Sequence, residues 1–196
     1  MPIRSICVYC GAHAGHNPNY AATAARFGEL LAHRELDLIY GGGNIGLMGV
    51  VADAALRHGS RVTGIIPHSL ADKELAHLDV SELIRVDSMH ERKLEMANRA
   101  DAFVALPGGI GTLEELFEVF TWQQLGFHSK PIGLLDVDGY YRPLLDFLDG
   151  AVQSGFLRAE HRQLLITANS PEDLLEQILA ARPEVNDRWY DHRRQT

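Results

Sequence analysis

The chain has 196 residues, of which 46% are hydrophobic and 22% are charged, the proportions of one globular domain with its own core. The net charge of −8 disfavours broad nucleic-acid binding, which depends on many lysine and arginine contacts to phosphate. No apolar run is long enough to cross a membrane and the N-terminus lacks the organisation of a signal peptide, so we expect no membrane partner and a cytoplasmic location.

Apolar strand-like runs alternate with helical patterns along the chain. We expect strands at residues 3–9, 37–40, 61–66, 82–86, 102–106, 132–135 and 164–167. We expect helices at residues 18–34, 46–58, 89–100, 140–154 and 171–181, and another that carries Leu113, Leu116, Phe117 and Phe120 on its apolar face. Such alternation builds βαβ units, so the predicted fold class is α/β, a doubly wound parallel sheet with helices on both faces. One domain is expected over residues 1–182, followed by a polar tail at 183–196.

A C-x-x-C pair near the N-terminus is followed by two histidines at the same spacing, giving Cys7, Cys10, His13 and His16. This spacing fits either a redox pair or a zinc site. However, Cys7 lies inside the first predicted strand, whereas a redox pair normally begins a helix. Strand alternation also directs the two cysteines to opposite faces. We therefore expect buried thiols and loop histidines, and no metal site.

Three glycine-bearing loops follow predicted strands. They contain Gly11 with Gly15, the sequence GGGNIG at 41–46, and PGGIG at 107–111. Because parallel strands end at one edge of the sheet, these loops are expected to meet there, where doubly wound sheets bind ligands. None of them matches the dinucleotide fingerprint or the lysine-bearing P-loop. The pattern therefore favours a pocket for a mononucleotide or a sugar phosphate.

The sequence PGGIGTLEE at 107–115 joins a predicted buried strand to a helix. Backbone N–H groups of such a turn face open space at the positive end of the helix dipole, where phosphate binds. Glu115 lies one turn inside the helix, within reach of whatever carries the phosphate. Two alternatives are a tight turn alone and a capping box made by Thr112 and Glu115. The carboxylate beside the loop favours an enzyme acting on a phosphorylated sugar.

The predicted helix at 89–100 contributes the second polar element. Its apolar face carries Met89, Met96, Ala97 and Ala100. Arg92 and Lys93 flank that face, so at least one is expected to point inward; the alternative is that both extend into solvent. An inward arginine near a phosphate loop can bind an oxyanion bidentately. Ser88 and Glu91 form a further capping box, which makes Glu91 structural.

The segments GGGNIGLMG at 41–49, SMHERK at 88–93 and PGGIGTLEE at 107–115 closely resemble the Lonely Guy (LOG) family. The likeness extends collinearly from VYCG at 8–11, through residues 121–141, to about residue 180. Members of that family are cytokinin riboside 5′-monophosphate phosphoribohydrolases, often mislabelled as lysine decarboxylases. The resemblance implies a Rossmann-like fold, a homodimer and a nucleoside monophosphate substrate. The implied reaction hydrolyses the N-glycosidic bond of an N6-substituted AMP, releasing the free base and ribose 5-phosphate.

The resemblance implies that Arg92 and Glu115 are the catalytic pair. Substrate-binding positions are expected at Gly11, Gly42, Gly43, Met89, Lys93, Pro107, Gly108, Gly109, Gly111 and Thr112. Among these, the resemblance assigns the phosphate to Gly108, Gly109, Gly111 and Thr112. No cofactor is expected, because a pyridoxal enzyme needs a Schiff-base lysine in a recognisable site and none of the candidate lysines has one. Those lysines are Lys73, Lys93 and Lys130.

Glu115 is expected to stay ionised, because the helix dipole favours a carboxylate. An ionised glutamate suits a base that orients water, or an anion that stabilises an oxocarbenium-like ribosyl cation. Arg92 would hold the ribosyl phosphate or Glu115 itself in position. Two rival classes are a non-catalytic nucleotide-binding module and a nucleic-acid-binding Rossmann-like protein, and the second would need a basic groove.

Overall fold

The computed structural model describes residues 2–71 and 75–182 of the chain. The strands within these residues are β1 (Ser5–Tyr9), β2 (Asp37–Tyr40), β3 (Val62–Pro67), β4 (Glu82–Val86), β5 (Ala102–Ala105), β6 (Ile132–Leu135) and β7 (Leu165–Ala168). They form one sheet in the order β4-β3-β2-β1-β5-β6-β7, and every neighbouring pair is parallel. Each predicted strand is confirmed to within two residues, and β7 is an edge strand.

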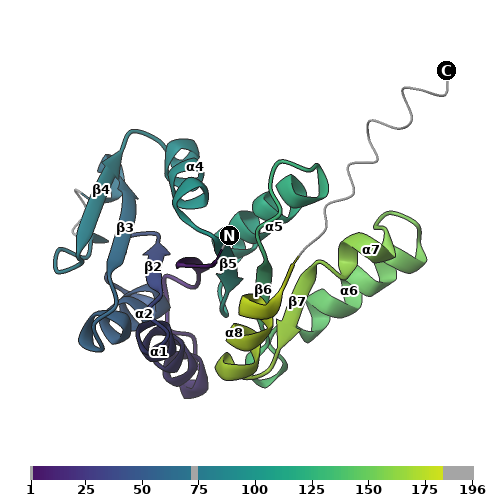
Figure 1. Ribbon diagram of the computed structural model, residues 1–196, viewed down its shortest axis with the longest axis horizontal. Coiled ribbons are helices and arrows are strands. Elements are labelled where there is room, and N and C mark those ends of the chain that lie inside the picture. Colours follow the sequence, from purple (N-terminus) through teal and green to yellow (C-terminus); the bar gives the residue numbers. More distant parts are fainter. Residues whose placement is uncertain (1, 72–74, 183–196) are drawn as a thin grey trace.

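Helices cover both faces of the sheet (Figure 1). The described helices are α1 (Pro18–His33), α2 (Gly46–Arg57), α3 (His68–Leu70), α4 (Met89–Arg99), α5 (Ile110–Gln124), α6 (Arg142–Gln153), α7 (Ala159–Arg162) and α8 (Pro171–Ala180). Over the same residues, none of them combines the length and the apolar character that a membrane crossing requires. The predicted α/β class with a doubly wound parallel sheet is confirmed, whereas the tail at 183–196 lies outside the described residues.

The predicted start of α6 is two residues too early. A 3₁₀ turn at Val137–Gly139 precedes the helix, and Asp138 within it has φ 53° while Gly139 has φ 76°. Two consecutive left-handed residues cannot belong to a right-handed helix, so the chain turns sharply before α6 begins. The short α7 was not predicted, because four residues give too little periodicity.

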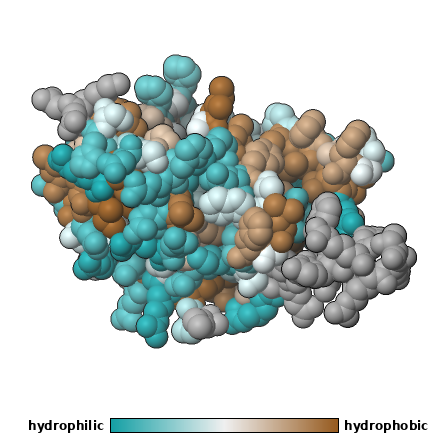
Figure 2. All heavy atoms as spheres, turned by 90° about the horizontal axis from the view of Figure 1, so that it is seen from above, coloured by the Kyte–Doolittle hydropathy of each residue, from teal (hydrophilic) through white to brown (hydrophobic). Residues whose placement is uncertain are grey.

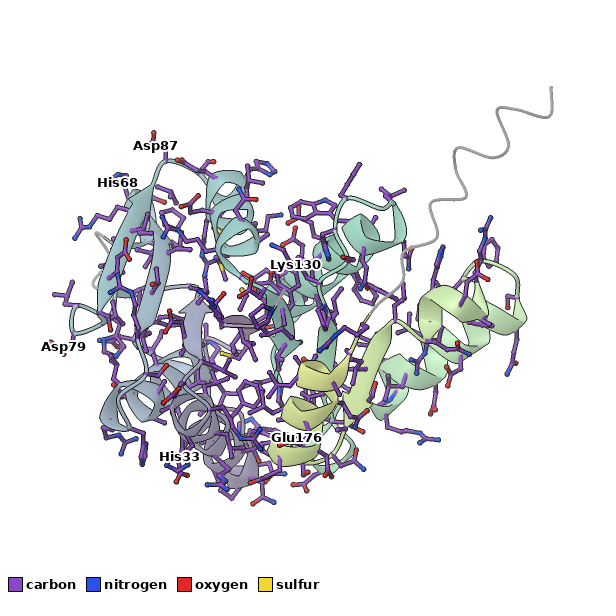
Figure 3. The ribbon with its side chains drawn as sticks, viewed as in Figure 1. His33, His68, Asp79, Asp87, Lys130 and Glu176 are labelled. Atoms are coloured by element: carbon purple, nitrogen blue, oxygen red, sulfur yellow. The ribbon has the colours of Figure 1, made fainter. Side chains whose placement is uncertain are left out.

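Two apolar cores lie on opposite faces of the sheet. In the first core, the sheet packs against α1, α2 and α8, which lie below it in Figure 1. In the second core, the sheet packs against α4, α5 and α6. Cys7 belongs to the second core and Cys10 to the first, so the prediction of opposite faces is confirmed. Both thiols are free and buried, and burial raises the pKa of each well above its ordinary value. Figure 3 shows side chains filling these layers, with Lys130 nearer the middle and Asp79 at the periphery.

The strand order reverses at β1, which has β2 on one side and β5 on the other. Connections leaving β1 and β5 therefore diverge and open a crevice at their carboxyl ends. Hydrogen bonds join the three glycine loops at this edge: the Gly11 N–H donates to the Pro107 carbonyl (3.0 Å) and the Leu47 N–H donates to the Gly11 carbonyl (3.0 Å). The predicted meeting of the loops is thus observed.

Candidate active site

A cavity of about 390 Å³ lies at the carboxyl ends of β1 and β5. Its walls come from the loop after β1, the start of α2, one side of α4 and the start of α5, with two tyrosines from α1 and the turn before α6. Most of the predicted site residues line this cavity: Gly11, Arg92, Pro107, Gly108, Gly109, Gly111, Thr112 and Glu115. The structure therefore places both members of the predicted catalytic pair and the glycine loop around one space.

The amino end of α5 has no side-chain cap. The N-cap residue is Gly109 and the helix begins at the next residue, so Thr112 lies inside the first turn. The alternative of a capping box made by Thr112 and Glu115 is therefore wrong, because that box requires Thr112 at the cap itself. The N–H groups of an uncapped first turn remain available, and together with the helix dipole such groups can bind an anion.

Close packing behind the loop requires glycine at position 108. A Cβ atom there would lie 2.1 Å from the Thr112 Oγ1 and 2.9 Å from the Gly11 backbone nitrogen. At Gly109 and Gly111, in contrast, a Cβ atom would meet nothing within 4 Å. The loop is thus tightly packed at its first glycine and open at the other two, where a ligand has room to approach the backbone.

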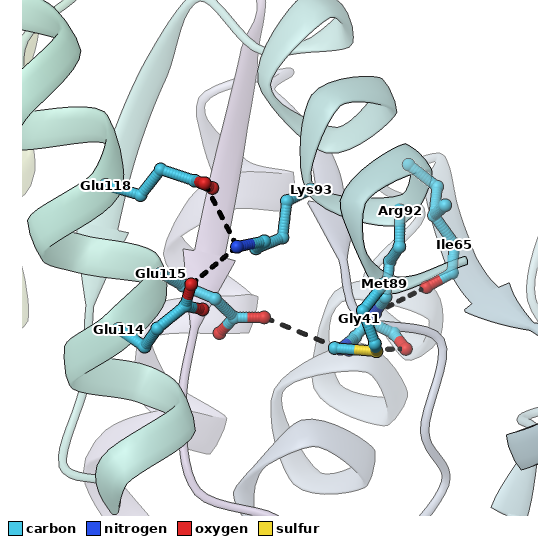
Figure 4. A network of polar contacts seen from close by, with 8 residues as sticks. All are labelled: Gly41, Ile65, Met89, Arg92, Lys93, Glu114, Glu115 and Glu118. Atoms are coloured by element: carbon cyan, nitrogen blue, oxygen red, sulfur yellow. Dashed lines mark hydrogen bonds and ion pairs between the residues drawn. The ribbon is translucent and has the colours of Figure 1, made fainter.

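Arg92 lines the cavity, and its guanidinium is fixed on three sides (Figure 4). Its Nε donates to the Ile65 carbonyl (3.0 Å) and its Nη2 to the Gly41 carbonyl (2.9 Å). Its Nη1 lies 3.5 Å from the Glu115 Oε1. Only 8% of Arg92 is exposed, and Lys93 is equally buried, so the alternative that both extend into solvent is wrong. The prediction of an inward arginine is confirmed.

The carboxylate of Glu115 borders the cavity, and only 11% of its side chain is exposed. Burial raises its pKa to about 7; Arg92 opposes this shift, and the neighbouring carboxylate of Glu114 adds to it. The expectation of a glutamate kept ionised by the helix dipole is wrong, because the cost of desolvating the charge outweighs the favourable charges nearby. Near neutral pH the carboxyl group therefore populates both protonation states.

Lys93 points towards α5 and does not line the cavity. Its Nζ lies 2.5 Å from the Glu114 Oε1 and 3.0 Å from the Glu118 Oε1, on either side of Glu115 in the helix (Figure 4). The structure therefore brings Lys93 into an ion-pair cluster beside the site and not into the cavity wall. Its assignment to substrate binding stays a prediction.

Three other predicted binding residues also lie outside the cavity wall. The Gly42 carbonyl accepts from the His77 N–H (2.9 Å), and Gly43 forms a bridge with Ala76, so both glycines shape the loop after β2. Met89 is the first residue of α4 and is 44% exposed, although it was predicted on the apolar face; its sulfur lies 3.8 Å from the Arg92 Nη1. Their roles in binding stay predictions.

Several residues that line the cavity were not predicted. They include Tyr20, Leu47, Met48 and Tyr140. Tyr20 lies within the predicted helix at 18–34, and Tyr140 is the first residue of the predicted helix at 140–154. A usable signal was present for Tyr140, since it directly follows an Asp-Gly pair after a predicted strand, where tight turns place side chains at the ligand-binding edge.

Neither of the two lysines in the described part of the chain lines this cavity. Lys130 donates from its Nζ to the Ala97 carbonyl (2.7 Å), and burial lowers its pKa. Lys93 is engaged by two carboxylates, and Lys73 lies outside the described residues. Among the residues that the structure describes, the cavity wall contains no lysine, so its side chains do not fit pyridoxal chemistry.

Comparison with known proteins supplies independent information. The family described as "possible lysine decarboxylase" matches residues 48–178. The cytokinin riboside 5′-monophosphate phosphoribohydrolase LOG7 of Arabidopsis thaliana is 47% identical over 184 residues, which cover 94% of this chain and 85% of that protein. The cytokinin riboside 5′-monophosphate phosphoribohydrolase LOG of Oryza sativa subsp. japonica is 50% identical over 181 residues, or 92% of this chain and 75% of that protein.

Among solved structures, the molybdenum cofactor binding protein of Rippkaea orientalis superposes with a TM-score of 0.68 at 25% sequence identity. The match covers 91% of this chain and 96% of that one. Its likeness supports the Rossmann-like architecture.

Proposed function

The chain belongs to the LOG family of cytokinin riboside 5′-monophosphate phosphoribohydrolases, and from that membership we propose that its cavity hydrolyses the N-glycosidic bond of such a nucleotide. The products are the free base and ribose 5-phosphate. The observation that carries the proposal is the Glu115–Arg92 pair beside an uncapped helix N-terminus in one cavity. A phosphate site and a reactive carboxylate one helical turn apart match the two ends of a ribose 5-phosphate unit.

In this proposal the phosphate binds to the first turn of α5, where the open backbone at Gly109 and Gly111 lets its oxygens approach the N–H groups. The ribose then extends along the helix towards Glu115. Arg92 holds the carboxylate in place through the ion pair and is itself held by two backbone carbonyls. A reacting group fixed in this way loses little further entropy in the transition state.

The chemical step follows from the properties of Glu115. As the bond from C1′ to the base nitrogen breaks, the base leaves with the bonding electron pair and the ribose acquires oxocarbenium character. An ionised Glu115 stabilises that positive charge. It then accepts a proton from the water that attacks C1′, which a carboxylate with a pKa of about 7 does better than an ordinary glutamate. The departed base anion takes up a proton from solvent to give the free base, and Glu115 returns its own proton to solvent.

A substrate comparison tests the proposal against the nucleotide-binding module. AMP and isopentenyladenosine monophosphate are each compared with the nucleoside that lacks the phosphate. The proposal predicts base release from the monophosphates with kcat/KM about 100-fold or more above that from the nucleosides, because binding energy at the phosphate is used at the reacting bond. Tight binding of the monophosphates without any base release would leave the binding module as the better account.

The proposal includes a homodimer. Exposed apolar side chains lie on α4 and around the two ends of α5, namely Met89, Leu94, Ile110, Leu125 and Phe127. Figure 2 views the molecule from above, where α4 lies in Figure 1, and shows hydrophobic areas between hydrophilic ones. Large exposed apolar side chains such as these are candidate contacts for a partner subunit. Light scattering of the purified protein measures its mass in solution. The cytoplasmic location stays a prediction from the sequence.

The charge cluster beside the site leads to a prediction about pH. Lys93 lowers the pKa of Glu115, whereas Glu114 and Glu118 raise it. Replacing Lys93 with methionine removes the cation and leaves those two carboxylates unpaired, so the pKa of Glu115 rises above 7. Since the reaction needs ionised Glu115, the fall in kcat on the acid side is expected to move to higher pH by about one unit.

A pH profile of kcat at saturating substrate measures this shift. The matched control is Arg61→Met, which removes an exposed cation that pairs with Glu82 near the amino ends of the strands. An acid limb unchanged in the Lys93 variant would contradict the coupling between the cluster and Glu115. The charged and titratable groups that act on or near Glu115 come from α4, α5, β1 and the residue after β1: Arg92, Lys93, Glu114, Glu118, Cys7, Tyr9 and Cys10.

A further inference from the structure

Two adjacent tyrosines hold the segment that leads into α5. The Tyr140 hydroxyl donates to the Gly108 carbonyl (2.6 Å), and the Tyr141 hydroxyl donates to the Leu106 carbonyl (2.7 Å). Tyr141 is buried, whereas Tyr140 lines the cavity and is 40% exposed. The carbonyls of alternate residues are thus anchored from one turn, and the second anchor lies at the first glycine of the loop.

The turn that carries Tyr140 is itself fixed. The side-chain amides of Asn17 and Asn19, at the start of α1, each donate to the Asp138 Oδ2 at 2.8 Å. The Tyr140 ring makes edge contacts with the rings of Tyr20 (5.5 Å between centroids) and Tyr141 (4.8 Å). The Tyr140 phenol therefore has a fixed position relative to α1. Its hydrogen bond to the Gly108 carbonyl fixes the glycine loop relative to α1 in turn.

Fixing the Gly108 carbonyl also fixes a hydrogen-bond donor. In a planar trans peptide the carbonyl of one residue and the N–H of the next point in opposite directions, so the Gly108 carbonyl determines the direction of the Gly109 N–H. Glycine on both sides of the peptide leaves it few steric restraints against rotation. The Tyr140 hydroxyl is thus the contact that selects one orientation of a peptide at the N-cap of α5.

Resting on the proposed function, we propose that Tyr140 is a positioning residue that holds the Gly109 N–H towards the substrate phosphate. It acts through the Gly108 peptide and not by touching the phosphate. A hydroxyl whose single proton is donated to a carbonyl presents only lone pairs elsewhere, and these repel phosphate oxygens. Removing the hydroxyl therefore weakens recognition of the phosphate end of the substrate and leaves recognition of the base end unchanged.

The test measures binding, so it does not require turnover. Calorimetry with the full chain compares ribose 5-phosphate, inorganic phosphate and adenine on the parent and on Tyr140→Phe. The variant is expected to bind both phosphate compounds about fivefold more weakly, the effect of one net hydrogen bond, and adenine equally well. In the hydrolysis assay KM rises by a similar factor while kcat changes little. The control is Tyr40→Phe, since the Tyr40 hydroxyl is buried outside the cavity wall and has no hydrogen-bond partner in the described residues.

Unchanged affinity of Tyr140→Phe for ribose 5-phosphate would overturn the inference. An equal loss of affinity for ribose 5-phosphate and adenine would overturn it too, because that result indicates general damage to the cavity. A second variant, Asp138→Ala, keeps the hydroxyl and frees the turn; it is expected to weaken ribose 5-phosphate binding in the same direction by a smaller factor. If the parent binds ribose 5-phosphate yet releases no base, the proposed function fails while this inference is still decided by the binding data.

Discussion

Replacing Glu115 with glutamine is expected to lower kcat for base release by about 10²–10⁴-fold. Glutamine keeps the size of the side chain but carries no negative charge and accepts no proton from water. KM is expected to change little, because the proposed phosphate site is at the start of α5, one turn away. Steady-state kinetics with isopentenyladenosine monophosphate measures both constants. The control is Glu172→Gln, which removes a surface carboxylate that pairs with Arg26.

The same substitution is expected to stabilise the fold at high pH. Because the pKa of Glu115 is raised from 4.5 to about 7, the folded protein binds more protons than the unfolded chain between these values. The parent therefore loses stability as the pH rises through that window, by up to about 3 kcal/mol, and the glutamine variant does not. The variant should unfold at a higher temperature than the parent at pH 8, with the difference vanishing near pH 4. Loss of activity together with a lower Tm at pH 8 would contradict this account.

Replacing Arg92 with lysine is expected to lower kcat/KM by about 10²-fold or more. The guanidinium reaches the carbonyls of Ile65 and Gly41 and the carboxylate of Glu115 at once, whereas a single ammonium cannot keep that planar arrangement. Leaving a buried carbonyl without its donor also costs about 1–3 kcal/mol of stability. Kinetics and thermal unfolding of the same preparation measure the two effects. Near-normal kcat/KM in this variant would show that the reaction does not need the planar guanidinium of Arg92.

Gly41→Ala tests the same arrangement without altering a reacting group. A Cβ atom at position 41 would lie 1.8 Å from the Arg92 Nη2, so the guanidinium has to move away from the Gly41 carbonyl. The clash is with the end of a side chain and not with backbone, so the fold is expected to survive while kcat falls about 10–100-fold. Gly150→Ala in α6 is the matched control, because a Cβ atom there meets nothing within 4 Å. Full activity in Gly41→Ala would contradict the proposal that the Gly41 carbonyl positions Arg92 for the reaction.

Much of the fold was predictable because each strand is a short apolar run bounded by turn residues, and because parallel strands place successive loops at one edge. The turn at Asp138 was not, since its left-handed conformation is held by Asn17 and Asn19, which lie more than a hundred residues away in the chain. The misplaced start of α6 has this cause, whereas the Asp-Gly pair before Tyr140 was a local signal for that residue.

The candidate site was predictable in its composition and less so in its electrostatics. Helical periodicity placed Arg92 and Lys93 on the flank of α4, yet it does not tell which partner each meets. In the structure, Arg92 forms an ion pair with Glu115, and Lys93 forms ion pairs with Glu114 and Glu118. The raised pKa of Glu115 could not be read from the local helix dipole, because its burial results from β1, α4 and α5 packing together.

The most direct measurement is the identity and stoichiometry of the products formed from isopentenyladenosine monophosphate by the purified protein. Chromatography with mass detection quantifies the free base, ribose 5-phosphate, the nucleoside and inorganic phosphate over a time course. The account predicts free base and ribose 5-phosphate in equal amounts, with their formation suppressed in Glu115→Gln. Nucleoside with inorganic phosphate, or no product from a nucleotide that binds, would contradict it.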